Sequence, residues 1–83
     1  MNPATVAVLA LAERHVNEGP MASSARVCLN DALSLFVAGD IFHAEKRALR
    51  SLAYSVGIFH SDYSLAVDII ARDANAEPVA VAS

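Results

Sequence analysis

The sequence contains a single cysteine, Cys28, which excludes an intramolecular disulfide and a zinc site made of cysteines. Small secreted domains usually need disulfides to stabilise a small core, so one cysteine favours a reducing compartment, and we expect a cytoplasmic protein. The apolar stretch 4–12 is too short to span a bilayer, and no basic residue precedes it. We therefore expect neither a secretory signal nor contact with a membrane.

Glycine, tryptophan and positive charge are also scarce. The three glycines form neither a phosphate-binding loop nor the elbow of a serine nucleophile, and tryptophan is absent. Six basic residues against nine acidic residues give a formal net charge of −3, which argues against a strongly basic nucleic-acid-binding arm. We expect a protein that is not an enzyme and needs no cofactor.

Apolar residues, many of them alanine, are abundant instead. They make up 55% of the 83 residues, whereas a domain of this size buries only about 60% of the surface that its unfolded chain exposes. Part of the apolar surface should therefore stay exposed after folding, and exposed apolar patches usually mark interfaces between proteins. The composition favours a homo-oligomer or a complex with another protein.

Capping residues and apolar periodicity predict an all-α fold, a compact bundle of about four helices. Asn2 caps the first helix, Ser23 or Ser24 starts the second, and Ser61 or Asp62 starts the fourth. The third covers about 41–56. We expect a single helical domain over 1–74 and a flexible C-terminal tail over 75–83.

The turn Ala38-Gly39-Asp40 separates two apolar stripes and predicts an antiparallel helical hairpin. This hairpin resembles a single tetratricopeptide repeat, although no second copy follows. The resemblance rests on five residues that follow the order of such a repeat, three small or apolar residues and the two turn residues: Ala32, Leu35, Gly39, Asp40 and Ala44. It implies a packed hairpin of a kind often used to bind other proteins.

Helical wheels give three further expectations about burial. On the second predicted helix, Leu33 falls on the apolar stripe with Cys28, and on the third helix Phe42 belongs to the apolar half. The pair 58–59, an isoleucine and a phenylalanine, should be part of the core. Glu45 also falls within the apolar half, so its carboxylate needs a partner, for which we expect Arg26 on the facing helix.

The three histidines lie on different segments, and none is spaced three or four residues from another. Helical metal sites usually show such spacing, so the sequence predicts no metal site at His15, His43 or His60. Structural or surface roles are favoured for all three.

Half of the basic residues lie close together on the third predicted helix. Lys46, Arg47 and Arg50 share its polar face with His43 and Tyr54. These five residues are the candidate partner-binding site, with another protein that carries an acidic surface as the expected partner. Two alternatives stay open: phosphate contacts with a nucleic acid, or a face that is only solvated.

The sequence thus favours a non-catalytic protein-interaction protein. It would be an adaptor, or a small inhibitor that masks the surface of its partner, as phages and mobile genetic elements encode. The alternative is a small nucleic-acid-associated regulator that contacts phosphates through helix 41–56.

Overall fold

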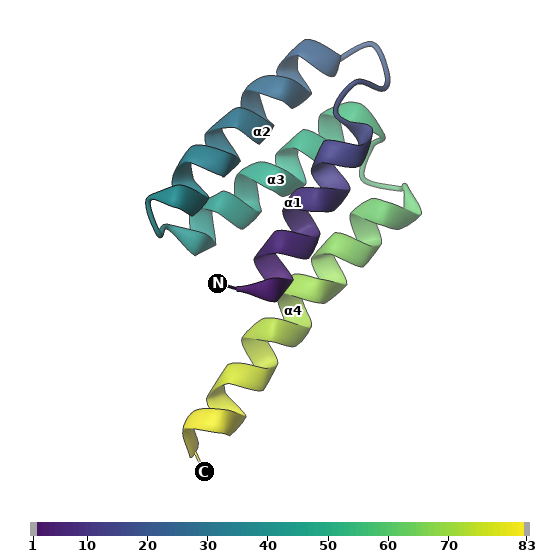
Figure 1. Ribbon diagram of the computed structural model, residues 1–83. Coiled ribbons are helices and arrows are strands. Elements are labelled where there is room, and N and C mark those ends of the chain that lie inside the picture. Colours follow the sequence, from purple (N-terminus) through teal and green to yellow (C-terminus); the bar gives the residue numbers. More distant parts are fainter. Residues whose placement is uncertain (1, 83) are drawn as a thin grey trace.

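The computed structural model describes the backbone of residues 2–82 and the side chains of residues 2–74, and it confirms the predicted all-α bundle. The four helices are α1 (Pro3–His15), α2 (Ala22–Val37), α3 (Ile41–Ser55) and α4 (Ser61–Ala82) (Figure 1). Helix α4 thus runs past the predicted domain boundary at 74. The side chains of the predicted flexible tail, 75–83, lie outside the described residues, so its flexibility stays a prediction. Within the described residues, no helix combines the length and apolar character that crossing a bilayer requires.

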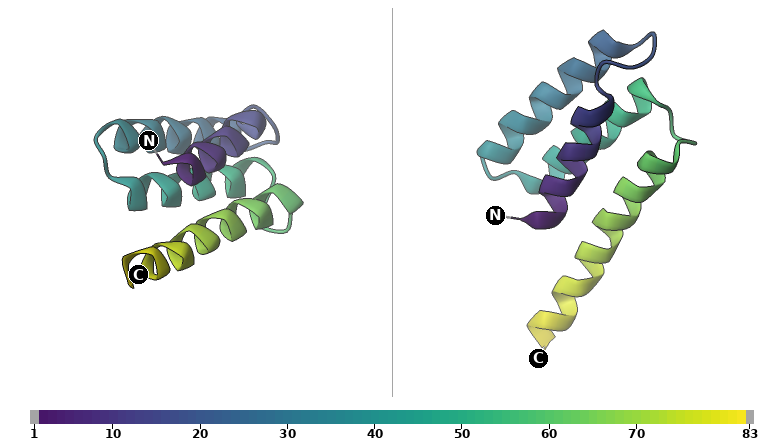
Figure 2. Two further views of the ribbon diagram at one scale, coloured as in Figure 1. Left: turned by 60° about the horizontal axis from the view of Figure 1, so that its bottom comes forward. Right: turned by 45° about the vertical axis from the view of Figure 1, so that its right-hand side comes forward.

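Helices α2 and α3 form the predicted antiparallel hairpin, and they make the most extensive contact between any two helices. Helix α1 lies between α2 and α4 and crosses α3, as Figure 1 and the right-hand view of Figure 2 both show. It contacts all three other helices, α2 least of all. The first helix of the chain therefore connects the hairpin to α4.

Local signals define both ends of the hairpin turn. Gly39 has a φ of +88°, its N–H donates to the carbonyl of Phe36 over 3.0 Å, and the N–H of Asp40 donates to the carbonyl of Leu35 over 2.9 Å. This is the left-handed helix end that glycine favours. The Asp40 side chain then accepts from the N–H of His43 over 3.2 Å and caps α3. The predicted turn is confirmed.

Helix α2 starts close to the predicted serines, but the predicted serine cap is wrong. The helix begins at Ala22, and its cap residue, Met21, makes no side-chain hydrogen bond. Before it, the chain turns at Gly19, where φ is +80° and a Cβ atom would lie 2.6 Å from the carbonyl oxygen of Ser55. This turn therefore packs closely on the end of α3, and α2 begins after it without a serine cap.

Small side chains make up much of the core. Ser51 of α3 is fully buried, and its hydroxyl donates to the carbonyl of Ala25 on α2 over 2.8 Å. Six alanines have no exposed surface: Ala12, Ala25, Ala32, Ala44, Ala48 and Ala66. Because an alanine occupies little space, helices can approach closely wherever one lies between them. Part of the alanine content is thereby explained by close packing.

Several large apolar side chains lie outside the core, contrary to the predictions. Phe59 is 96% exposed and Ile58 is 54% exposed; both lie in the loop between α3 and α4, and neither belongs to the core of the described residues or packs against it. Phe42 is 65% exposed and Leu33 is 38% exposed. Both side chains lie at the edge of the apolar face of their helix. A helical wheel does not show whether a neighbouring helix covers that edge.

Glu45 is buried as predicted, but its predicted partner is wrong. The hydroxyl of Thr5 on α1 donates to Oε2 of Glu45 over 2.7 Å, while Arg26 bonds to the side-chain oxygen of Asn17. The pairing follows from the crossing of α1 over α3, which brings the first turn of α1 against Glu45.

Candidate functional site

The basic strip, which we define as Lys46, Arg47 and Arg50, lies on the exposed side of α3. His43 precedes it and Tyr54 follows it, and both side chains are also exposed. At 3.6 residues per turn, these five residues fall within a stripe about 100° wide. The structure therefore places the predicted site residues on one accessible face.

The basic strip forms no ion pair within the described part of the chain. There, no acidic group lies within 4.0 Å of a basic-strip nitrogen, whereas Arg14 pairs with Asp62 at 3.7 Å and Arg72 with Asp68 at 2.8 Å. Arg47 shares a shallow groove with Asp31 of α2 without forming an ion pair. The basic strip is thus a local positive surface on a protein with net negative charge.

Two neighbours change the composition of this surface. Nδ1 of His43 lies 2.9 Å from a carboxylate oxygen of Asp40, and this hydrogen bond holds the pKa of Asp40 below its usual value of 3.8. His43 therefore belongs to the helix cap. Phe42, which the wheel assigned to the core, lies beside the basic strip instead, with Nζ of Lys46 5.1 Å from its ring centroid. The short spacing between Phe42 and Lys46, one helical turn, is the signal that could have indicated this contact.

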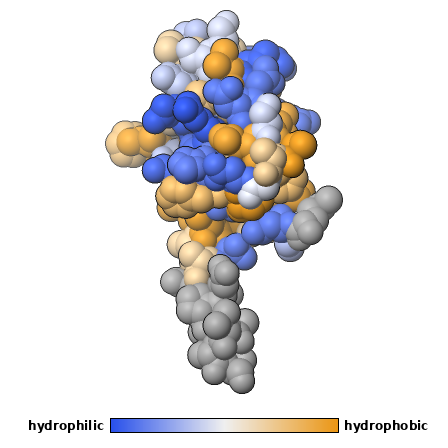
Figure 3. Space-filling model, turned by 90° about the vertical axis from the view of Figure 1, so that its left-hand side faces the viewer, coloured by the Kyte–Doolittle hydropathy of each residue, from blue (hydrophilic) through white to orange (hydrophobic). Residues whose placement is uncertain are grey.

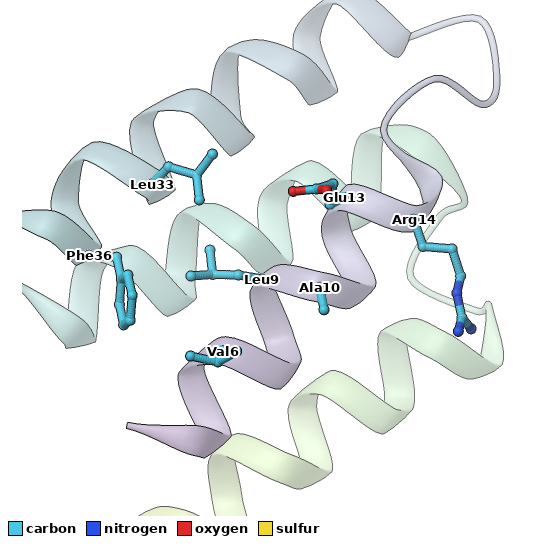
Figure 4. Close-up of a pocket in the computed structure, with 7 residues that line it drawn as sticks. All are labelled: Val6, Leu9, Ala10, Glu13, Arg14, Leu33 and Phe36. Carbon is cyan, nitrogen blue, oxygen red and sulfur yellow. The ribbon is translucent and has the colours of Figure 1, made fainter. Parts of the chain in front are cut away.

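A second surface feature, which the sequence did not predict, is a groove of about 450 Å³ between α1 and α2. Figure 4 shows Leu33 and Phe36 of α2 facing Val6 and Leu9 of α1, with Glu13 and Arg14 towards the other end. The groove follows from the limited contact between these two helices, which depends on the angle at which α1 crosses the hairpin.

Other exposed apolar side chains lie along the helices, such as Val27 of α2, which is 61% exposed, and at the ends of the bundle. Val37 is 87% exposed and flanks the α2–α3 turn together with Phe42, while Phe59 lies in the α3–α4 loop. Figure 3 shows that apolar and polar side chains are interspersed over the face that it presents.

A third feature is the histidine cluster, which we define as His15, His60 and Asp62. His15, at the end of α1, is 8% exposed, and its Nε2 lies 2.6 Å from Oδ2 of Asp62, in the first turn of α4. Its Nδ1 lies 2.7 Å from Oε2 of Glu18. The rings of His15 and His60 meet edge to face with centroids 5.1 Å apart. Sequence spacing gave no indication of this cluster, because α1 and the α3–α4 loop meet only in the tertiary structure.

Hydrogen bonding shifts the pKa values of two groups in the cluster in opposite directions. The bond to Asp62 raises the pKa of His15 above 6.5, although burial of the imidazole opposes the shift. The same bond lowers the pKa of Asp62 below 3.8. Both shifts favour a charged pair that connects α1 to α4.

No protein-family model, no curated protein and no solved structure matches this chain. The resemblance of the hairpin to one tetratricopeptide repeat rests on its own residues and stays a prediction.

Proposed function

We propose that the protein is a non-catalytic interaction module, an adaptor or a small inhibitor, that binds an acidic surface of another protein through α3. The observation that carries the proposal is the basic strip: three exposed cations without an acidic partner among the described residues. Complementary charge at an interface accelerates encounter and selects the partner.

The residues beside the basic strip support a protein as the partner. Phe42 is 65% exposed and Tyr54 is 38% exposed, so the positive surface is flanked by aromatic rings. Arginine and aromatic side chains are enriched in interfaces between proteins, where aromatic rings often carry much of the binding energy. The net charge of −3 disfavours a polyanion such as a nucleic acid as the partner.

The proposal can be tested by capture from an extract of the native host, followed by mass spectrometry. The bait is compared with a charge-reversed basic-strip variant, Lys46→Glu, Arg47→Glu and Arg50→Glu. A matched control reverses the other three basic residues, Arg14→Glu, Arg26→Glu and Arg72→Glu, and so has the same net charge. We expect a protein with an acidic surface to be captured by the wild type and by the control, and to be lost from the basic-strip variant.

The nucleic-acid alternative is tested with a labelled 20-base-pair DNA duplex at 50 and 200 mM salt. If the protein makes several phosphate contacts, the rise from 50 to 200 mM salt should weaken its binding to DNA by on the order of a thousandfold. The nucleic-acid-associated regulator would be favoured if DNA affinity falls in this way and the basic strip is not needed to capture any protein. Equal capture of the same proteins by all three baits would contradict a role for the basic strip.

A further inference from the structure

We propose that His15, His60 and Asp62 bind one borderline divalent transition-metal ion, such as Zn²⁺, where the end of α1 meets the start of α4. The proposal is independent of the interaction surface, because it uses residues of α1, the α3–α4 loop and α4 rather than of α3.

The donor set suits such an ion. Each of the three residues offers one ligand atom, two imidazole nitrogens and one carboxylate oxygen, and these atoms lie within 4.8 Å of one another. Zinc accepts nitrogen and carboxylate oxygen at about 2.0–2.2 Å, so two ligand atoms on one tetrahedral ion lie about 3.3 Å apart. The 2.6 Å between Nε2 of His15 and Oδ2 of Asp62 must therefore lengthen, and any longer distance within the 4.8 Å limit must shorten. His60 and Asp62 are only partly buried, so rotation of their side chains can provide this change.

His15 is already oriented for coordination. It is almost fully buried, and with its Nδ1 held by the Glu18 carboxylate at 2.7 Å, its Nε2 faces Asp62. In metal sites, a ligating histidine usually donates its second N–H to a carboxylate, which fixes the ring and strengthens its donor nitrogen. Glu18 is in the place of that carboxylate and acts as a positioning residue.

Metal binding exchanges hydrogen bonds for coordination. The proton on Nε2 of His15 leaves to solvent, and Oδ2 of Asp62 turns to the ion from that N–H and from Arg14, which lies 3.7 Å away. Nδ1 of His60 accepts the backbone N–H of Asp62 over 3.0 Å, so ligation through this nitrogen replaces that hydrogen bond. The freed N–H belongs to the first turn of α4, where water can accept it. Water also completes the coordination of an ion held by three protein ligands.

The bound ion would join the end of α1 to the loop that begins α4. Since a metal that binds the folded state raises the apparent stability, added Zn²⁺ should raise the melting temperature of the protein.

The test is a calorimetric titration of tag-free, chelator-treated protein with ZnSO₄, with MgCl₂ as a comparison. We expect one Zn²⁺ per chain and no binding of Mg²⁺, which prefers oxygen ligands. His60→Ala removes a ligand and should weaken Zn²⁺ binding at least about tenfold. Glu18→Gln, which weakens the hydrogen bond at Nδ1 of His15, should weaken Zn²⁺ binding about tenfold. His43→Ala is the matched control, because His43 is also a histidine beside an aspartate but lies outside the cluster.

A second measurement uses CoCl₂, whose visible absorption reports tetrahedral coordination by the folded wild type. The proposal is overturned if the wild type binds no Zn²⁺, in which case the cluster is a hydrogen-bond network only. It is also overturned if His43→Ala weakens binding as much as His60→Ala does, which would indicate adventitious binding to surface histidines.

Discussion

At the scale of single residues, the buried pair of Thr5 and Glu45 shows where sequence reasoning ends. The position of Glu45 on the helical wheel predicted its burial and its need for a partner. The partner, however, comes from another helix that is 40 residues away in sequence, and only the crossing of α1 over α3 determines it. The cluster around His15 was missed for the same reason.

Thr5→Val should destabilise the protein by about 1–3 kcal/mol, because it leaves a buried carboxylate without its donor. In a Glu45→Met background the same substitution should cost much less, since no carboxylate then needs a partner. Urea unfolding of the four proteins in this double-mutant cycle measures the difference. Equal costs in both backgrounds would show that the hydrogen bond contributes nothing to stability.

At the scale of helices and turns, prediction succeeded where the signal is local. Gly39 and Asp40 combine a left-handed helix end with a helix cap, so these two adjacent residues define the hairpin turn. The prediction of a serine cap for α2 was wrong: Met21 precedes the helix, after a turn at Gly19 that lies close to the carbonyl of Ser55, and this approach is tertiary and leaves no local signal. The basic strip was found from helical periodicity alone, whereas the exposure of Phe42 depends on which faces the other helices leave uncovered.

Two glycine substitutions separate backbone conformation from packing. Gly39→Ala should cost about 1–2 kcal/mol, the penalty of a left-handed residue with a Cβ, since an added Cβ would meet no described atom within 4 Å apart from its chain neighbours. Gly19→Ala carries the same penalty and adds a clash with backbone, so it should cost at least about 1 kcal/mol more. Thermal and urea unfolding compare the two variants. A smaller effect at Gly19 would mean that this turn does not pack on α3 as described.

The cap of α3 predicts a dependence of stability on pH. Because the hydrogen bond from His43 holds the folded-state pKa of Asp40 below 3.8, its contribution to stability is present well above that pH and is lost as the pH falls through the lowered pKa. Asp40→Asn keeps a capping oxygen that does not titrate. The stability difference between wild type and Asp40→Asn should therefore shrink as the pH falls from about 5 to 2, which melting curves over this range would measure. A difference that stays constant from pH 5 to pH 2 would contradict this assignment.

At the scale of the whole molecule, the exposed apolar side chains bear on association. Phe59, Val37 and Phe42 each expose more than half of their surface, and the groove between α1 and α2 adds further apolar surface. We expect a dimer or a larger species at micromolar concentration. Light scattering after size exclusion measures the mass, and a monomer near 8.7 kDa at high concentration would contradict the expectation.

The most direct test of the central claim, that the basic strip is the binding surface, is the affinity of the captured partner for three proteins. The wild type is compared with the charge-reversed basic-strip variant and with the matched control at Arg14, Arg26 and Arg72. Because the reversed side chains are exposed, and the two ion pairs that the control breaks involve exposed arginines, circular dichroism and the melting temperature should stay close to those of the wild type. We expect the basic-strip variant to bind at least tenfold more weakly, about 1.4 kcal/mol, and the control to bind as the wild type does. Undiminished affinity of the basic-strip variant would contradict the account and leave the strip a solvated face.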